Sequence, residues 1–274
     1  MSGAFSALVP MEAGGGEEGE EGFAAPGVQS FDLPPLYEGA PEWLNKYVLM
    51  AVVSVIVVLA FWLIMSRNQK LVPSRGQFIG EAAYFFVRNG IARDMIGHDF
   101  RRYLPFLIAL FSFVLVNNLW GIFPLTLLPT TSHVGWAYGL AGMVWLLYNG
   151  VGIAKHGPAG YLRHTVLPSG VPKAMWPIII PLEFFSNIIV RPMTLSLRLF
   201  ANMFAGHLLV LVFVLGGEFL LLHTDSIVNK LAGVVAWLFS LAIFGLEIFV
   251  QALQAFIFTV LTANYIASAA AEEH

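Results

Sequence analysis

The 274-residue sequence has no cysteine and few charged residues. Without cysteine the chain can form neither disulfides nor thiolate metal sites, and the redox compartment stays undecided. Only 11% of the residues are charged, against roughly 25% in soluble proteins, and 58% are hydrophobic. There is no basic tract with interleaved aromatic residues and no glycine-rich phosphate-binding loop, so neither nucleic-acid binding nor phosphate-bond chemistry is predicted. The composition predicts an integral membrane protein.

The first 42 residues differ in composition from the rest of the chain. Residues 1–42 are rich in Gly, Glu and Pro and include the run GGGEEGEEG. They have no apolar periodicity, and such a composition predicts disorder. We therefore expect a disordered acidic tail at residues 1–42 and an integral membrane domain at residues 43–274.

Long apolar segments fill the membrane domain, and a bilayer takes ~20 helical residues to cross. Basic residues gather between the first two segments and after the third, which places those loops in the cytoplasm, the tail outside and the C-terminus in the cytoplasm. Between the first two segments, residues 77–90 separate polar from apolar side chains at helical spacing, which predicts an amphipathic surface helix. We predict spans at residues 47–65, 103–123, 134–154, 175–217 and 227–267.

The last two segments, residues 175–217 and 227–267, are each about twice as long as one crossing needs. Each is either two short spans or one strongly tilted helix. The link between them has no Lys or Arg and belongs outside, which requires an odd number of crossings and favours a single tilted helix, kinked at Pro192. The predicted fold is all-α: one upright N-terminal transmembrane helix, a surface helix, two further transmembrane helices, and a hairpin of two long tilted helices.

A polar stripe runs along the first long segment. At ~100° per residue its members share about one 100° sector of a helix that is otherwise apolar. A charge in such a segment costs ~3 kcal/mol, and an arginine cannot escape by losing its proton. The stripe is either a seam bound to a neighbouring helix or a polar path through the membrane. Its members are Glu183, Asn187, Arg191, Thr194, Arg198 and Asn202, with Ser186 beside them.

The last segment carries Glu247, Gln251 and Gln254 on one face, at i, i+4 and i+7. One antiparallel register places Arg198 opposite Gln254, Asn202 opposite Gln251 and His207 opposite Glu247. The polar pairs are either proton-carrying groups or interhelical contacts with no transport role. An ideal wheel puts His207 on the far side of the helix from Arg198. Either the helix is distorted near Gly206, or the two residues line different walls.

The chemistry of these residue types suits protons. A histidine titrates near pH ~6.5 and a carboxylate lower, so His207 and Glu247 in a wet cleft can relay a proton. Asn and Gln side chains can hold files of water. An arginine across the path repels hydronium and blocks direct leakage, as fixed positive charges do in selective pores.

Two stretches resemble subunit a of the F-type ATP synthase: LRLFANMFAGH at residues 197–207 and QALQAFIFTVLTANYI at residues 251–266. The NNLWGIFP stretch at residues 117–124 and the spacing from Arg191-Pro192 to the first motif are also similar to this family. The resemblance covers the chain from about residue 77 to the C-terminus. It implies a proton-conducting stator subunit beside the rotating c-ring.

The resemblance also implies residue roles. Arg198 matches the arginine that faces the c-ring carboxylate, Asn202 the asparagine beside it, and Gln254 a glutamine packed near the arginine. In some bacterial members the outer positions are Glu in the first helix and His in the last, and here His207 and Glu247 exchange those places. Gln251 is also expected to take part in proton translocation, and the cytoplasmic half-channel is expected to contain Glu183, Ser186, Asn187 and Thr194.

The implied complex has the c-ring, the peripheral-stalk subunit b and the lipid bilayer as partners. The resemblance implies a non-catalytic subunit in a bacterial cell membrane, with no metal or cofactor. From the residues alone, two other classes of membrane protein remain possible. A self-contained transporter would use Arg198 to bind an anionic substrate, and a structural scaffold would use the polar stripes only for helix packing.

Overall fold

The computed structural model describes residues 27, 41, 44–67, 70–122, 130–167 and 175–271. All the regular elements in these ranges are helices, and five helical stretches are long and apolar enough to cross a membrane. The all-α membrane fold is thereby confirmed. Apart from residues 27 and 41, the predicted acidic tail lies outside the described residues.

The first two helices form an antiparallel pair. From the second of them, the chain is almost continuously helical up to residue 119. The Asn45 side chain caps α1 (Lys46–Ser66) by accepting a hydrogen bond from the Val48 amide at 3.2 Å. The Ser74 side chain caps α2 (Arg75–Val87) by accepting one from the Gln77 amide at 3.3 Å. The predicted surface helix at residues 77–90 falls in α2 and the start of η3. The elements are α1 (Lys46–Ser66), α2 (Arg75–Val87), the π-helical turn η3 (Arg88–Arg93), α3 (Asp94–Ile96), the 3-10 turn η4 (Gly97–Asp99) and α4 (Phe100–Leu119).

The next helix, α5 (Val134–Val166), follows the short 3-10 turn η5 (Thr130–Ser132) and extends beyond the predicted span at 134–154. It changes direction at Gly157, whose φ of 73° is open to glycine but strained for other residues. The segment after this break folds back, so that the Tyr161 hydroxyl donates a 3.0 Å hydrogen bond to Asn149 Oδ1. The end of α5 is therefore a hook rather than a straight extension.

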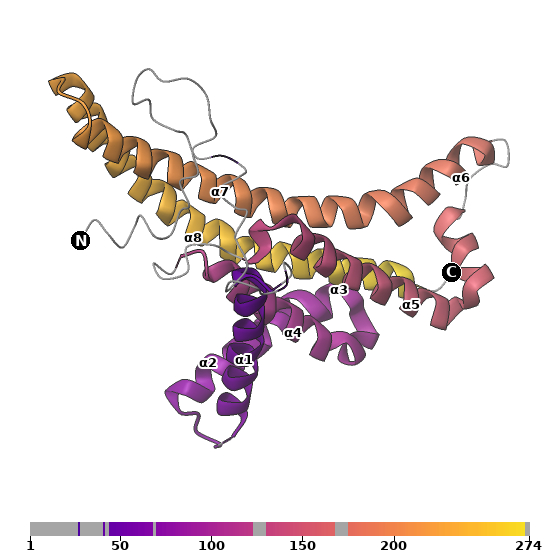
Figure 1. Cartoon of the computed structure of the whole chain (residues 1–274). Helices are drawn as coiled ribbons and strands as arrows, with labels where there is room; N and C mark the ends of the chain where they lie inside the picture. The colour runs from indigo at the N-terminus through magenta and orange to yellow at the C-terminus, as the bar shows by residue number, and fades with distance from the viewer. Residues whose placement is uncertain are drawn as a thin grey trace.

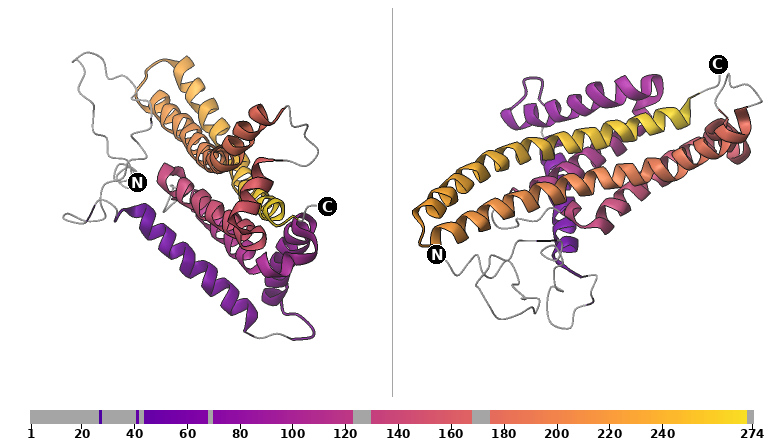
Figure 2. Two further views of the ribbon diagram at one scale, coloured as in Figure 1. Left: turned by 90° about the vertical axis from the view of Figure 1, so that its right-hand side faces the viewer. Right: turned by 90° about the horizontal axis from the view of Figure 1, so that it is seen from above.

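The two long segments form the predicted antiparallel hairpin (Figures 1 and 2). α6 (Trp176–Phe185), the π-helical turn η7 (Ser186–Val190) and α7 (Arg191–Leu222) make one continuous path of 47 residues, and α8 (Ile227–Ala270) has 44 residues. Each is thus one long helical path and not two short spans. Near the tip of the hairpin the helices touch at Gly217 and Gly233, where a Cβ at Gly233 would lie 2.9 Å from the Gly217 carbonyl oxygen.

The helical path is distorted just before Pro192, in the π-helical turn η7. Proline has no backbone N–H, so it cannot bond the Ile188 carbonyl in an α-helical pattern or the Asn187 carbonyl in a π-helical one. Side chains of α5 replace the missing donor. Trp145 Nε1 donates to the Ile188 oxygen at 3.0 Å, and the Tyr148 hydroxyl donates to the Asn187 oxygen at 3.1 Å.

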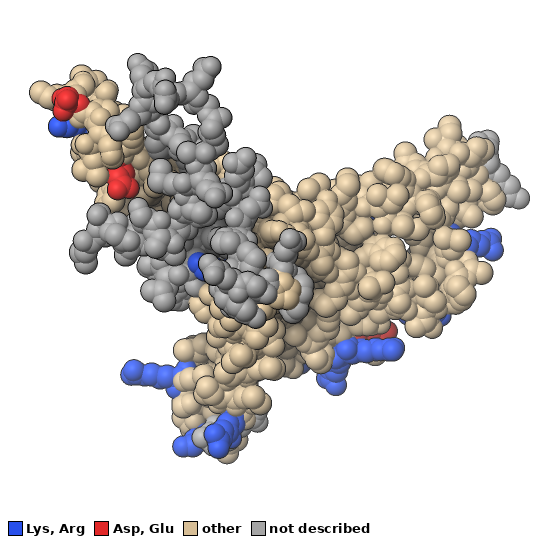
Figure 3. All heavy atoms as spheres, viewed as in Figure 1, with Lys and Arg blue, Asp and Glu red and all other residues tan. Residues whose placement is uncertain are grey.

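The buried core lies where α4, α5, α7 and α8 meet, around Leu107, Val144, Leu199 and Phe258. Large apolar side chains cover much of the outside of α1, α7 and α8, as expected for surfaces that face lipid. Lysine and arginine gather over the ends of the helices, and uncharged side chains cover the broad middle (Figure 3). This pattern is that of a chain whose middle lies in hydrocarbon.

Candidate functional site

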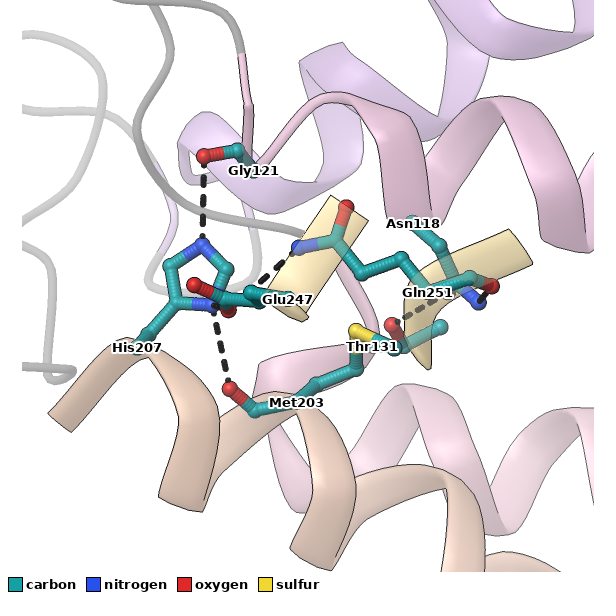
Figure 4. Close-up of polar contacts among 7 residues, drawn as sticks. All are labelled: Asn118, Gly121, Thr131, Met203, His207, Glu247 and Gln251. Atoms are coloured by element: carbon teal, nitrogen blue, oxygen red, sulfur yellow. Dashed lines mark hydrogen bonds and ion pairs between the residues drawn. The ribbon is translucent and has the colours of Figure 1, made fainter. Parts of the chain in front are cut away.

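His207 of α7 and Glu247 of α8 form a buried ion pair, as the antiparallel register predicts (Figure 4). The two residues are only 5% and 8% exposed, respectively. Gly206 makes room for the carboxylate, because a Cβ there would lie 2.9 Å from Glu247 Oε1. An acid and a base are therefore held in contact, away from bulk water, at the interface of the two long helices.

Both ring nitrogens of His207 face oxygen acceptors. Nδ1 lies beside Glu247 Oε1 and 3.2 Å from the Met203 carbonyl oxygen, and Nε2 lies 3.3 Å from the Gly121 carbonyl oxygen. Nε2 thus faces a backbone carbonyl and Nδ1 faces the carboxylate. The ring therefore connects Glu247 with the Gly121 carbonyl through its two nitrogens.

Further polar side chains continue from this pair into the fold (Figure 4). Gln251 is fully buried, and its Nε2 donates to Glu247 Oε1 at 3.3 Å. Its backbone carbonyl accepts a 3.2 Å hydrogen bond from Asn118 Nδ2, and Asn118 Oδ1 accepts a 3.0 Å hydrogen bond from Thr131. The pair thus belongs to a polar cluster built from α4, η5, α7 and α8.

Gln254 and Asn202 form the next contact along the hairpin. Asn202 Nδ2 donates to Gln254 Oε1 at 2.8 Å. The predicted pairs Arg198–Gln254 and Asn202–Gln251 are therefore wrong by about one helical turn, although His207–Glu247 is right. Two buried atoms, Gln251 Oε1 and Gln254 Nε2, have no hydrogen-bond partner among the described residues. Such atoms are normally satisfied by ordered water.

Arg198 lies on the outer face of α7, exposed and without a hydrogen bond or ion pair to any described residue. α7 is a regular α-helix from Arg191 to Leu222, so the distortion considered near Gly206 does not occur. His207 faces α8 while Arg198 faces away from the fold. The two residues line different walls, which was the second of the two expectations.

A second polar cluster lies nearer the start of α7, around a cavity of about 160 Å³. Asn187 Nδ2 donates to Glu183 Oε2 at 3.0 Å and to the Thr165 carbonyl oxygen at 2.9 Å. Arg191 also lines the cavity, and its guanidinium lies 5.4 Å from the centre of the Tyr265 ring. The remaining lining residues are Tyr148, Tyr161, Ser268 and Ala269.

Two of the expected cytoplasmic-side residues are not part of this cavity lining. Thr194 is exposed, and its hydroxyl donates within its own helix to the Val190 and Arg191 carbonyls at 2.8 and 3.1 Å. The Ser186 side chain is half-buried and makes no hydrogen bond with a described residue. Thus Glu183 and Asn187 are brought together, and Ser186 and Thr194 are not.

Between the two clusters, the interface of α7 with its neighbours is apolar. Leu195, Leu199 and Met203 are at most 2% exposed, and Phe258 of α8 is fully buried beside them. The buried hydroxyls in this region donate their hydrogen bonds within their own helices. Ser196, Thr259 and Thr262 each donate to a backbone carbonyl three or four residues earlier. The clusters are therefore separated inside this chain.

Several residues of both clusters were not among the expected site residues. Arg191 belongs to the polar stripe, and Asn118 and Gly121 belong to the NNLWG stretch, so sequence signals for these existed. Thr131, Thr165 and Tyr148 carry no such signal, because their roles depend on how η5 and α5 pack. Within the described ranges, no group of three or more His, Cys, Asp or Glu residues could hold a metal ion.

Comparisons with known proteins agree with one another. The family model described as ATP synthase A chain matches residues 47–267. The ATP synthase subunit a of a Nocardioides species is 45% identical, with 98% of this chain and 99% of that relative covered. The proteins of the same name from Pseudarthrobacter chlorophenolicus and Streptomyces lividans are 47% and 36% identical, over 90% and 92% of this chain and 93% and 90% of theirs.

The match spans all five predicted membrane segments and includes His207, Glu247, Glu183, Asn187 and Arg198. The relatives are bacterial, and five helices here can cross a membrane, so the protein is a multi-pass bacterial membrane protein. The chain belongs to the ATP synthase A chain family, the proton-translocating stator subunits of the ATP synthase membrane sector, which carry no catalytic site of their own.

Proposed function

We propose that the two polar clusters are two offset half-channels that exchange protons with carboxylates on the c-ring. The outer half-channel contains His207, Glu247 and Gln251 and leads to Asn202 and Gln254. The cytoplasmic half-channel is the cavity at Glu183 and Asn187, and Ser186 and Thr194 lie outside its lining. The clusters are centred about 30 Å apart along the helix, measured from Asn187 to His207 at ~1.5 Å per residue.

The main support for this proposal is the apolar packing between the two clusters. A proton cannot pass from His207 to Asn187 through the buried Leu195, Leu199 and Met203 without an uncompensated charge in an apolar region. It can pass only if a carrier outside this chain takes it from one cluster and delivers it to the other. A rotating ring of protonatable carboxylates is such a carrier.

Arg198 stands on the face that such a carrier would contact. Its guanidinium is exposed, lies between the two clusters in sequence and has no partner among the described residues. It attracts a carboxylate that has lost its proton, and it repels hydronium that would otherwise connect the half-channels. Ring carboxylates therefore stop at Arg198 deprotonated and turn into the lipid protonated.

The charge distribution supports the orientation with residues 1–42 outside and the C-terminus in the cytoplasm. Basic residues surround the α1–α2 connection, η3 and the start of α4, and further ones lie near the end of α5. On this orientation α2 rests on the cytoplasmic surface, and protons enter from outside at His207. The proposed partners are the c-ring on the Arg198 face, the peripheral-stalk subunit b and the lipid bilayer.

Inverted membrane vesicles test this proposal, with Arg198→Ala compared with the unmodified protein. ATP-driven acidification should disappear in the variant, and respiration-driven acidification should persist, with blotting to confirm that the subunit is assembled. The matched control is Thr194→Ala, which removes an exposed polar group one turn earlier that bonds only its own helix. Assembled Arg198→Ala complexes that pump at the normal rate would show that the arginine is structural.

A further inference from the structure

A separate groove of about 700 Å³ lies between α1, α2, η3 and α4, away from both proton clusters. Most of its wall is apolar, with Leu59 and Trp62 on α1 and Leu104 and Ile108 on α4. Leu59 is 56% exposed at its edge, so the groove opens on the outer face of α1. That face is apolar along the whole span, which means that the groove opens toward hydrocarbon.

Two arginines line the groove together with these apolar side chains. Arg88, at the start of η3, is half-buried, and its guanidinium lies 5.9 Å from the ring centres of both Phe85 and Phe100. Arg101, at the start of α4, is exposed. Neither forms a hydrogen bond or an ion pair with a described residue. The groove thus pairs an apolar wall with two uncompensated positive charges.

Among the described residues, none of the nearby carboxylates of Glu81, Asp94 and Asp99 forms an ion pair with Arg88 or Arg101. Glu81 accepts a 2.7 Å hydrogen bond from Gln77, and Asp99 lies 3.6 Å from His98. Figure 3 shows basic side chains, with little red, along the edge of the molecule where α2 and the start of α4 lie. The occupant that complements the groove is therefore apolar over most of its length and negatively charged at one end.

We propose that the groove binds one anionic phospholipid. An acyl chain packs between α1 and α4 against Leu59 and Ile108, and the phosphate lies between the guanidinium groups of Arg88 and Arg101. Basic pockets between transmembrane helices bind anionic headgroups in this way, and arginine suits phosphate because it can donate two parallel hydrogen bonds. A soluble phosphate would leave the apolar part of the groove empty. The headgroup of a zwitterionic lipid would add a positive charge next to the two arginines.

Native mass spectrometry of the intact purified complex tests the proposal, after exchange into phosphatidylglycerol or phosphatidylcholine. The double variant Arg88→Gln/Arg101→Gln should retain one phosphatidylglycerol fewer per complex. At about fivefold per arginine, the affinity of this lipid should fall roughly 25-fold. The control is Arg102→Gln, which removes a neighbouring exposed arginine that lies over Tyr103 and does not line the groove. Equal phosphatidylglycerol retention in the double variant and the control would overturn the proposal.

A second measurement leaves the arginines in place. The photoreactive residue p-benzoylphenylalanine replaces Leu59, and the assembled complex is irradiated in native membranes. A covalent adduct with the mass of phosphatidylglycerol supports the proposal. A cross-link to another subunit, or an adduct of equal yield in membranes made only of phosphatidylcholine, overturns it.

Discussion

Replacing Gly121 by alanine is expected to disable the His207–Glu247 pair. A Cβ at Gly121 would overlap Nε2 and Cε1 of the His207 ring and lie 3.1 Å from Gln251 Nε2. Non-bonded atoms need ~3.5 Å, so the ring must retreat by on the order of 1 Å. The 3.3 Å contact between His207 Nε2 and the Gly121 carbonyl oxygen would then be lost, and the ring would shift against Glu247.

The size of the effect follows from the cost of overpacking, which is ~1–3 kcal/mol in a packed interior. If the proton-transfer step bears that cost, passage through the outer half-channel slows roughly 5- to 150-fold. The assay is passive proton flux through vesicles stripped of the catalytic sector and driven by a potassium diffusion potential. Gly142→Ala is the matched control, because a Cβ at Gly142 meets nothing within 4 Å. Normal flux in an assembled Gly121→Ala complex would show that the contact between His207 and the Gly121 carbonyl is not needed for proton passage.

Three further substitutions probe the remaining contacts. Glu247→Gln should abolish the flux, whereas the exchange His207→Glu/Glu247→His should retain a measurable part of it, because an acid and a base remain paired; equal loss in both would contradict a relay. Trp145→Phe leaves the Ile188 carbonyl without its donor, so the complex should lose ~1–3 kcal/mol of stability and melt at a lower temperature. Glu183→Gln should slow ATP-driven pumping, whereas Thr194→Val should not; the reverse order would place the cytoplasmic path elsewhere.

The helices and the hairpin were predictable from sequence because hydrophobic length and charge bias act locally. Each long apolar segment folds as one helical path, and the spacing predicted the His207–Glu247 contact correctly. The same register failed one turn further along the hairpin, because spacing within each helix does not fix how two long helices pack against each other. Asn202, not Arg198, consequently reaches Gln254.

Contacts between residues from distant parts of the chain were harder to predict. The Gly121 carbonyl contacts His207 only because the end of α4 meets the hairpin, and no periodicity within either segment encodes that meeting. Pro192 indicated a distortion of the helix. No local pattern indicated that Trp145 and Tyr148 of α5 would donate hydrogen bonds to the carbonyls that Pro192 leaves free. Such contacts are decided by tertiary packing rather than by local pattern.

Proton leakage through intact complexes shows whether Arg198 keeps two separate half-channels apart. Vesicles that hold complete complexes without nucleotide, so that the ring does not turn, are given a diffusion potential, and proton uptake is followed. We expect little uptake with Arg198 present, strong uptake in Arg198→Ala, and little again in Arg198→Ala/His207→Ala, because the leak passes through the outer cluster. An Arg198→Ala complex as tight as the unmodified one, or a leak that persists without His207, would contradict this expectation.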